Sequence, residues 1–185
     1  MQKIKNNNRL KWVLPIFLML AGGHGLVLAQ SDGANPPSSP CETTEGFTDF
    51  DFWLGEWDVH LANGDLAGTN VITREERGCV LVERWTGATG GTGMSVNYLD
   101  MATGEWVQVW NAAGGSQINI RGGLSDDGML LEGTIHNVGG GVTAPFRGLW
   151  TPLPDGRVRQ YFEQSNDDGE TWVPWFEGFY TKKAK

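Results

Sequence analysis

The sequence predicts an all-β fold, an antiparallel up-and-down β-barrel of about ten strands with one short helix before the first strand. From Glu56 onward, apolar and polar residues alternate in short segments, and no long stretch has a helical period. Turn sequences such as DMATGE, DDG, PDG and NDDG separate these segments, so every connection is local. The 27 glycines suit the sharp bends of strands in a small barrel.

Residues 1–29 have the pattern of a secretory signal peptide. An apolar run, WVLPIFLMLAGGHGLVLA, places Val27 and Ala29 at the small-residue cleavage positions, and four cations precede it: Lys3, Lys5, Arg9 and Lys11. An uncleaved anchor is the alternative, but glycines and His24 interrupt the apolar core. We therefore expect a periplasmic or secreted protein, with a disordered linker over residues 30–41 and a single β-barrel domain over residues 42–185.

One short helix is expected over residues 48–55, TDFDFWLG, directly before the first strand. Thr48 suits the N-cap position, and Gly55 suits the C-cap position. The apolar side chains of Phe50, Trp53 and Leu54 would lie together and close one end of the barrel.

The candidate strands are evenly spaced along the rest of the chain. They cover residues 56–61, 68–75, 79–86, 93–99, 105–112, 117–124, 129–136, 143–153, 157–164 and 171–182. A succession of hairpins leaves two edge strands exposed, and closure into a barrel is the simplest way to hide them. A two-sheet sandwich is the alternative, although its crossovers usually require longer connections than these.

Cys41 and Cys79 are the only cysteines of the chain. In an exported protein, which meets an oxidising compartment, such a pair tends to close into a disulfide. The alternative is one buried free thiol and a second thiol in a disordered segment. A bridge would stabilise the fold by about 3 to 4 kcal/mol in the chain-entropy model.

The charge of the mature chain restricts its partners. Removal of the leader's four cations leaves 10 Lys and Arg against 22 Asp and Glu, a net charge near −12. Such an acidic surface repels phosphate backbones and anionic lipids, so neither nucleic acid nor a membrane surface is an expected partner after signal cleavage. A small-molecule ligand is the expected partner, and the oligomeric state stays open.

Four stretches carry a resemblance to a known family: FDFWLGEWDV, GCVLVERWTG, SVNYLDMATGEWVQVW and VRQYFEQSNDDGETW…FEGFY. Together they resemble a large uncharacterised family of small secreted bacterial β proteins, over nearly all of the mature domain. The resemblance implies a fold and a location outside the cytoplasm, and it implies no activity.

A more distant resemblance is to calycin and lipocalin-like barrels, in which a short helix leads into a GxW at the first strand. Gly55 and Trp57 stand at these two positions. The nitrobindin-like branch of these barrels has about ten strands and binds haem, which requires an axial histidine. His60 and His136 are the candidates in the mature chain, although a single His on a strand is more often an ordinary residue. We therefore expect no cofactor and keep haem as the alternative.

The stretch SNDDGETW, residues 165–172, fits the Asp-box pattern of sialidase propellers. A single copy in a short chain indicates a hairpin turn instead, with Asp167 accepting backbone N–H groups and Gly169 supplying a positive φ. Calcium at Asp167 and Asp168 is a weak alternative, because the EF-hand spacing is absent. The glycine-rich runs GATGGTG and VGGGV are also read as turns, since no helix follows either of them.

Several strands carry polar residues between apolar or aromatic neighbours. In a barrel one face of each strand points into the lumen, so alternating polar and aromatic side chains there would line a cavity. Exposure on the outer face is the alternative, because register cannot be read from the sequence. The lumen candidates are Glu83, Trp85, Asn97, Gln108, Trp110, Glu132 and Arg147, and Gln160 and Glu163 recur in similar surroundings.

Two functions follow from this pattern. The first is an exported barrel that binds a small, partly apolar ligand, supported by eight tryptophans in the mature chain. The second is an enzyme in which a desolvated lumen carboxylate, Glu83 or Glu132, acts as general acid or base with Arg147 as its partner. The sequence shows no nucleophile–base pattern and no HxH, HExxH or CxxC metal spacing.

Overall fold

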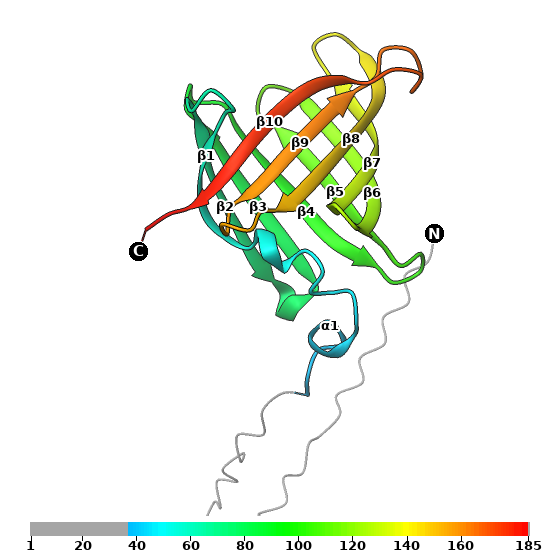
Figure 1. Ribbon diagram of the computed structural model, residues 1–185. Coiled ribbons are helices and arrows are strands. Elements are labelled where there is room, and N and C mark those ends of the chain that lie inside the picture. Colours follow the sequence, from blue (N-terminus) through cyan, green and yellow to red (C-terminus); the bar gives the residue numbers. More distant parts are fainter. Residues whose placement is uncertain (1–36, 185) are drawn as a thin grey trace, which may run out of the picture. The chain divides into compact units, whose positions relative to one another are not determined.

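Ten strands follow one another along the chain, and each is hydrogen-bonded to its sequence neighbours until the last pairs with the first (Figure 1). The computed structural model describes residues 37–184. The predicted closed antiparallel barrel is confirmed, and the sandwich alternative is wrong. The strands are β1 (Gly55–His60), β2 (Leu66–Glu75), β3 (Val80–Gly87), β4 (Thr92–Asp100), β5 (Glu105–Ala112), β6 (Ser116–Ser125), β7 (Gly128–Asn137), β8 (Val142–Pro152), β9 (Val158–Gln164) and β10 (Val173–Lys182).

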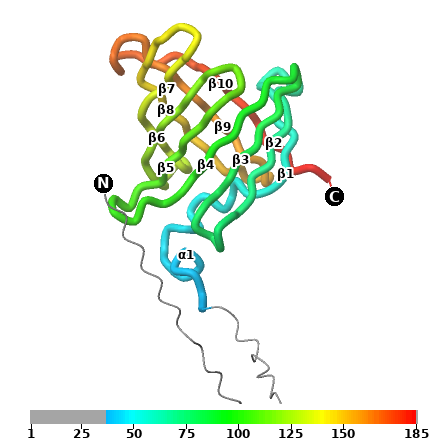
Figure 2. Tube along the Cα trace, turned by 180° about the vertical axis from the view of Figure 1, so that it is seen from behind, coloured from blue at the N-terminus to red at the C-terminus, as the bar shows by residue number. Residues whose placement is uncertain are grey.

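The barrel closes where β10 pairs with β1. Val59 lies opposite Tyr180, and Trp57 lies opposite Lys182. Figure 2, which shows the barrel from behind, has β3, β4, β5 and β6 on its near side, in the same order. All other strand pairs join sequence neighbours, so the barrel has no free edge along its wall.

The segment before β1 closes one end of the barrel, although not as the expected helix over residues 48–55. Only a 3₁₀ turn, η1 (Asp51–Trp53), forms there. Phe50 and Trp53 are nevertheless fully buried, and the Phe50 ring contacts the rings of Trp106 and Trp150. The predicted closure of one barrel end by Phe50 and Trp53 is therefore confirmed, while the predicted helix is not.

The GxW pattern marks the entry into the first strand. Gly55 has a φ of 135°, in which a side chain would be strained, so the chain can turn there into β1. The indole Nε1 of Trp57 donates a hydrogen bond to the carbonyl oxygen of Trp53 at 3.0 Å. Trp57 thus connects the first strand to Phe50 and Trp53, which form a plug at this end of the barrel.

The one α-helix of the described residues lies earlier than expected, at α1 (Pro40–Thr43). Ser39 accepts a hydrogen bond from the backbone of Cys41, and the Glu42 carboxylate accepts one from the backbone of Ser39, which together form a capping box. Pro40 occupies the first turn, where its missing N–H is not needed. The end of the expected linker over residues 30–41 is therefore ordered, because SPCE is itself a helix-start sequence.

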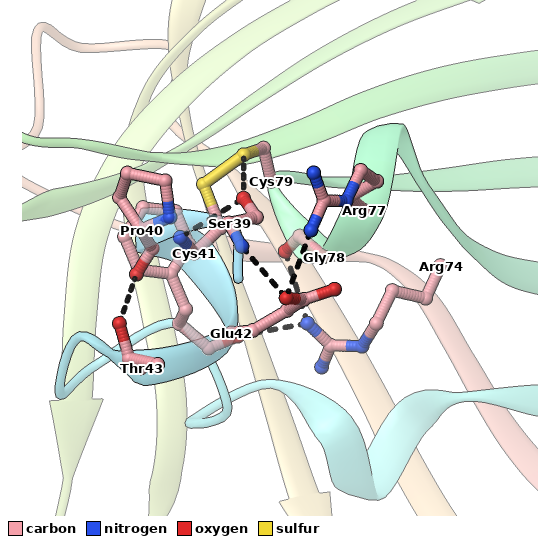
Figure 3. The surroundings of a disulfide bond; sticks show 10 residues. Ser39, Pro40, Cys41, Glu42, Thr43, Arg74, Arg77, Gly78 and Cys79 are labelled. Carbon is pink, nitrogen blue, oxygen red and sulfur yellow. Dashed lines mark hydrogen bonds and ion pairs between the residues drawn. A yellow bond between two sulfur atoms is a disulfide. The ribbon is translucent and has the colours of Figure 1, made fainter. Parts of the chain in front are cut away.

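A disulfide joins Cys41 of α1 to Cys79, directly before β3, and the predicted bridge is confirmed (Figure 3). Arg77, from the short turn η2 (Glu76–Gly78), donates to the Pro37 carbonyl oxygen at 2.6 Å. Arg74 donates to the Gly78 carbonyl oxygen at 3.0 Å and forms an ion pair with Asp51. Disulfides are typical of oxidising, extracytoplasmic compartments.

Two expectations fall partly or wholly outside the described residues. The signal peptide over residues 1–29 and most of the linker lie there. Between residues 37 and 184, no helix has the length and apolar character needed to cross a membrane.

Candidate functional site

The register of the barrel places three layers of side chains in its lumen, and β5 passes through all of them. Trp106, near the start of β5, packs on the plug residue Phe50 with ring centroids 5.7 Å apart. Gln108 is buried two residues later in a layer of polar side chains. Trp110, two residues further, lines a cavity toward the other end of the barrel. The lumen thus changes from apolar plug to polar layer to aromatic cavity.

The polar layer is one continuous chain of hydrogen bonds. On one side of Glu83, Gln108 Nε2 donates to Asn97 Oδ1 at 2.8 Å, and Asn97 Nδ2 donates to Ser95 Oγ at 2.8 Å. Ser95 Oγ then donates to Glu83 Oε2 at 2.6 Å. On the other side, Asn70 Nδ2 donates to Glu83 Oε1 at 2.7 Å. The carboxyl group of Glu83 is the point at which both arms meet.

The second arm continues to the strand that closes the barrel. Asn70 Nδ2 also lies 3.2 Å from the hydroxyl of Tyr180, which donates to Gln160 Oε1 at 2.6 Å. The chain therefore links β2, β3, β4 and β5 on one side with β9 and β10 on the other. Asn70 Oδ1 is buried without a hydrogen-bond partner among the described residues.

Burial dominates the acid–base properties of this layer. Glu83 is only 4% exposed, and loss of water disfavours its charged form, which raises the pKa of the carboxyl group to about 7. Hydrogen bonds from Ser95 and Asn70 act in the opposite direction and only partly offset this effect. Burial, and to a lesser extent the charge of Glu83, raises the pKa of the Tyr180 phenol well above its usual value near 10. Glu83 is therefore poised to change charge near neutral pH.

A cavity of about 210 Å³ lies beside this layer. Its walls are largely aromatic, and Trp175 at 46% exposure lies at its mouth. Within the part of the chain that the structure describes, none of its lining residues is a lysine, arginine or histidine. The lining residues are Glu83, Trp85, Gln108, Trp110, Ile118, Gln160, Phe162, Trp175, Phe176 and Tyr180.

Glycines on neighbouring strands leave room for the aromatic rings of the wall. A Cβ atom at Gly93 would collide with the ring of Trp110, and one at Gly68 would lie 2.7 Å from the ring of Trp85. Gly148 has the same relation to Phe162. These rings can therefore lie against bare backbone, which keeps the middle of the lumen open.

Five of the seven lumen candidates lie in the lumen, and two lie outside it. Glu83, Asn97 and Gln108 are buried in the polar layer, and Trp85 and Trp110 line the cavity. The prediction that Glu132 and Arg147 face the lumen is wrong. Their neighbours Leu131 on β7 and Phe146 on β8 are fully buried, and strand alternation then turns the two charged residues outward.

On the outer face, Arg147 has partners of its own. Arg147 Nε donates to Glu163 Oε2 at 2.7 Å, and the guanidinium lies 4.2 Å from the centre of the Trp172 ring. Glu163, which also recurred among the polar strand residues, is thereby placed outside the lumen. Arg147 consequently cannot serve as the partner of Glu83.

Neither His60 nor His136, the two histidines of the described residues, reaches the cavity, so neither fits the role of an axial haem ligand there. His136 on β7 lies next to buried Ile135 and shares a hydrogen bond of 2.7 Å with Thr143 on the outer face. His60 follows fully buried Val59 and therefore points outward from β1. The cavity of about 210 Å³ is also below the roughly 300 to 1,000 Å³ typical of sites for drug-sized ligands, and a haem needs more room still.

The Asp-box stretch forms the predicted turn. Asp167 Oδ1 accepts from the Thr171 backbone at 2.7 Å, and its Oδ2 accepts from the Thr171 hydroxyl at 2.6 Å. These bonds, with one from Ser165, lower the pKa of Asp167 to about 2. Gly169 has a φ of 96°, and β10 begins only at Val173, two residues later than expected. Among residues 37–184 no group of three or more His, Cys, Asp or Glu is placed to hold a metal ion.

Sequence reasoning missed Asn70 and Tyr180 in the polar layer. Asn70 lies between Gly68 and Ile72 at the period of two that defines one strand face, so its place in an inward-facing set was a usable signal. Trp175 was also missed, because a register shift between Pro174 and Phe176 interrupts the pairing of β10 with β9. Such an irregularity cannot be located from strand alternation alone.

The chain matches no family model, and no curated protein matches its sequence.

Proposed function

We propose that this barrel is an exported carrier or sensor that binds a small, partly apolar molecule in its lumen. The observation that carries the proposal is the cavity of about 210 Å³ with aromatic walls beside a buried polar layer. Apolar walls with a few convergent polar groups are the usual composition of small-molecule sites. The Cys41–Cys79 disulfide supports a location outside the cytoplasm, in the periplasm or beyond.

The size of the cavity limits the ligand. An engineered protein cavity of about 150 Å³ accommodates benzene. A volume of about 210 Å³ therefore suits a molecule the size of one substituted ring or a short branched chain. The amide groups of Gln108 and Gln160 line the same space and can hydrogen-bond to it.

The proposal is tested by ligand screening with a cavity variant. Trp85, Trp110 and Trp175 line the cavity, so quenching of tryptophan fluorescence by small-molecule pools should reveal saturable binding. Gly93→Ala should weaken binding at least tenfold, because the added methyl group forces the Trp110 ring out of its place. Gly114→Ala is the matched control, since a Cβ at Gly114 meets no atom within 4 Å. No saturable binding from any pool would overturn the proposal.

Acid–base catalysis by Glu83 is the second candidate function. The observation in its favour is a carboxyl group with a pKa of about 7 that lines a cavity. Glu132, the other candidate, is exposed on the outer face. Mass spectrometry of a bound ligand before and after incubation tests this function: chemical conversion that stops in Glu83→Gln would support it, and an unchanged ligand would exclude it.

A further inference from the structure

The charge balance of the lumen is unusual for a buried carboxyl group. Glu83 is 4% exposed and lines the cavity, yet none of the described lining residues carries a positive charge. Arg147, the expected partner, pairs with Glu163 on the outer face. Buried carboxylates normally have a cationic partner or are held neutral. Among residues 37–184, Glu83 therefore has no cationic partner in the lumen.

The hydrogen bonds around Glu83 are arranged for its ionised form. Asn70 donates to one carboxyl oxygen at 2.7 Å, and Ser95 donates to the other at 2.6 Å. The hydroxyl of Ser95 is itself held in this direction, because its oxygen accepts from Asn97 at 2.8 Å. Donors of this kind favour a carboxylate, whereas burial disfavours it. A positive charge entering the cavity would resolve this conflict.

The walls of the cavity suit such a charge. Trp85 and Phe176 meet edge to face with ring centroids 6.3 Å apart, and Phe176 lies 6.3 Å from Phe162. Phe162 in turn lies 6.2 Å from Trp175. Trp110 adds a ring from β5. Aromatic faces attract cations, tryptophan most strongly, and several rings around one site form the cage that recognises alkylated ammonium groups.

We propose that the ligand of this cavity is a small organic ammonium ion, held by the carboxylate of Glu83 and by the surrounding aromatic rings. This inference rests on the proposed ligand-binding function and names the chemical class of the ligand. An alkylated nitrogen suits the site because the cavity wall offers few acceptors for N–H groups. A carboxylate ligand would instead meet the negative charge of Glu83.

Three probes of nearly equal shape test the inference. Choline carries a trimethylammonium group, 3,3-dimethylbutan-1-ol carries a neutral tert-butyl group in its place, and 3,3-dimethylbutanoate is the anionic analogue. In titrations at pH 8 followed by tryptophan fluorescence, choline should bind at least ten times more tightly than the alcohol. The anion should bind most weakly.

Glu83→Gln is the variant that should lower this preference. It should lose most of the tighter binding of choline, so that only the smaller preference due to the aromatic rings remains, while its affinity for the alcohol stays within about threefold of the original. Glu132→Gln is the matched control, because it removes the same charge from the exposed outer face. An unchanged melting temperature or a higher one in Glu83→Gln confirms that the variant is folded.

The pH dependence provides a second readout. Choline has no titrating group in its cation, so a change of affinity between pH 5.5 and 8 reports on the protein. With a pKa of about 7, ionised Glu83 becomes scarce below neutral pH, and choline affinity should fall about tenfold for each pH unit there. The groups that face Glu83 do not titrate in this range: Asn70 on β2, Ser95 on β4, Gln108 on β5, Gln160 on β9 and Tyr180 on β10, whose pKa lies well above 10.

The outcomes separate the inference from the function on which it rests. If the alcohol binds saturably and choline binds no better, the ammonium inference is overturned while the ligand-binding function stands. If none of the three probes binds, the inference is also overturned, and the screen with the Gly93→Ala variant decides the proposed function. A choline preference that is undiminished in Glu83→Gln would likewise overturn the role of this carboxylate.

Discussion

Replacement of Glu83 with glutamine should stabilise the barrel at alkaline pH, although it removes a buried hydrogen-bonded side chain. Glutamine has nearly the same size and keeps one carbonyl oxygen for the donors Asn70 and Ser95. Its amide group cannot accept the second donor, and a lost hydrogen bond costs about 1 kcal/mol. The gain comes from removal of an uncompensated buried charge.

The magnitude follows from the pKa of Glu83. Its value is raised from 4.5 to about 7 by burial, and one pH unit corresponds to about 1.36 kcal/mol. Because the folded value is the higher one, the stability contributed by the protonated group is complete below pH 4.5 and is lost as the pH rises through about 7. The raised pKa of Glu83 thus costs the wild-type fold about 1 kcal/mol at pH 5 and about 3 kcal/mol at pH 8, relative to full protonation in both the folded and the unfolded state.

Subtraction of the lost hydrogen bond gives the expected result. Glu83→Gln should match the wild type at pH 5 and exceed its free energy of unfolding by about 2 kcal/mol at pH 8. Urea unfolding followed by tryptophan fluorescence at both pH values, with the disulfide intact, measures the difference. Glu132→Gln, exposed on the outer face, should show no comparable pH effect.

The change between the two pH values is the decisive quantity, because the hydrogen-bond cost is the same at both. A stability difference between variant and wild type that does not grow from pH 5 to pH 8 would refute the reasoning. Such a result would mean that Glu83 is not desolvated in the folded protein, and a cationic ligand would then no longer be expected to offset a buried charge.

Four further predictions follow from the structure. Double replacement of Cys41 and Cys79 with serine should lower the free energy of unfolding by about 4 kcal/mol, because the bridge spans a sequence separation of 38, and urea unfolding measures this. Trp53→Ala should cost about 3 to 5 kcal/mol and unseal the plugged end, which a lowered melting temperature and binding of a hydrophobic dye would show. Asp167→Ala should speed amide hydrogen exchange at Thr171, whose N–H it accepts at 2.7 Å, and unchanged exchange would contradict the turn assignment. Arg147→Ala should leave ligand affinity unchanged in fluorescence titrations, since this side chain lies outside the lumen.

The strand order of this barrel could be predicted because every connection is a short turn with its own sequence signature. Which face of each strand points into the lumen could not be predicted. Glu83 and Glu132 have similar neighbours, and a shift of one residue exchanges lumen for exterior. Exposed apolar residues such as Val96 and Val109 on the outer face also remove the contrast on which a face assignment depends.

The site was predictable only where one face of a strand had a distinctive composition. β5 presents Trp106, Gln108 and Trp110 at alternate positions, and all three lie in the lumen. Arg147 lacked such a signal, because the inward direction of its neighbours Phe146 and Gly148 is evident only from their contacts with Phe162. The helix over residues 48–55 failed for a related reason, since packing of Phe50 and Trp53 into the barrel end outweighed local capping preferences.

Because β1 pairs with β10, the closed barrel and its cavity can form only after the last strand has been synthesised. During synthesis from the N-terminus, nine strands emerge and can join their neighbours before β10 is made. Trp175, Phe176 and Tyr180 all belong to this final strand. A nascent chain that lacks β10 cannot close the barrel and lacks three of the residues that line the cavity. Any molecule held in the lumen can therefore be enclosed only after β10 has paired with β1.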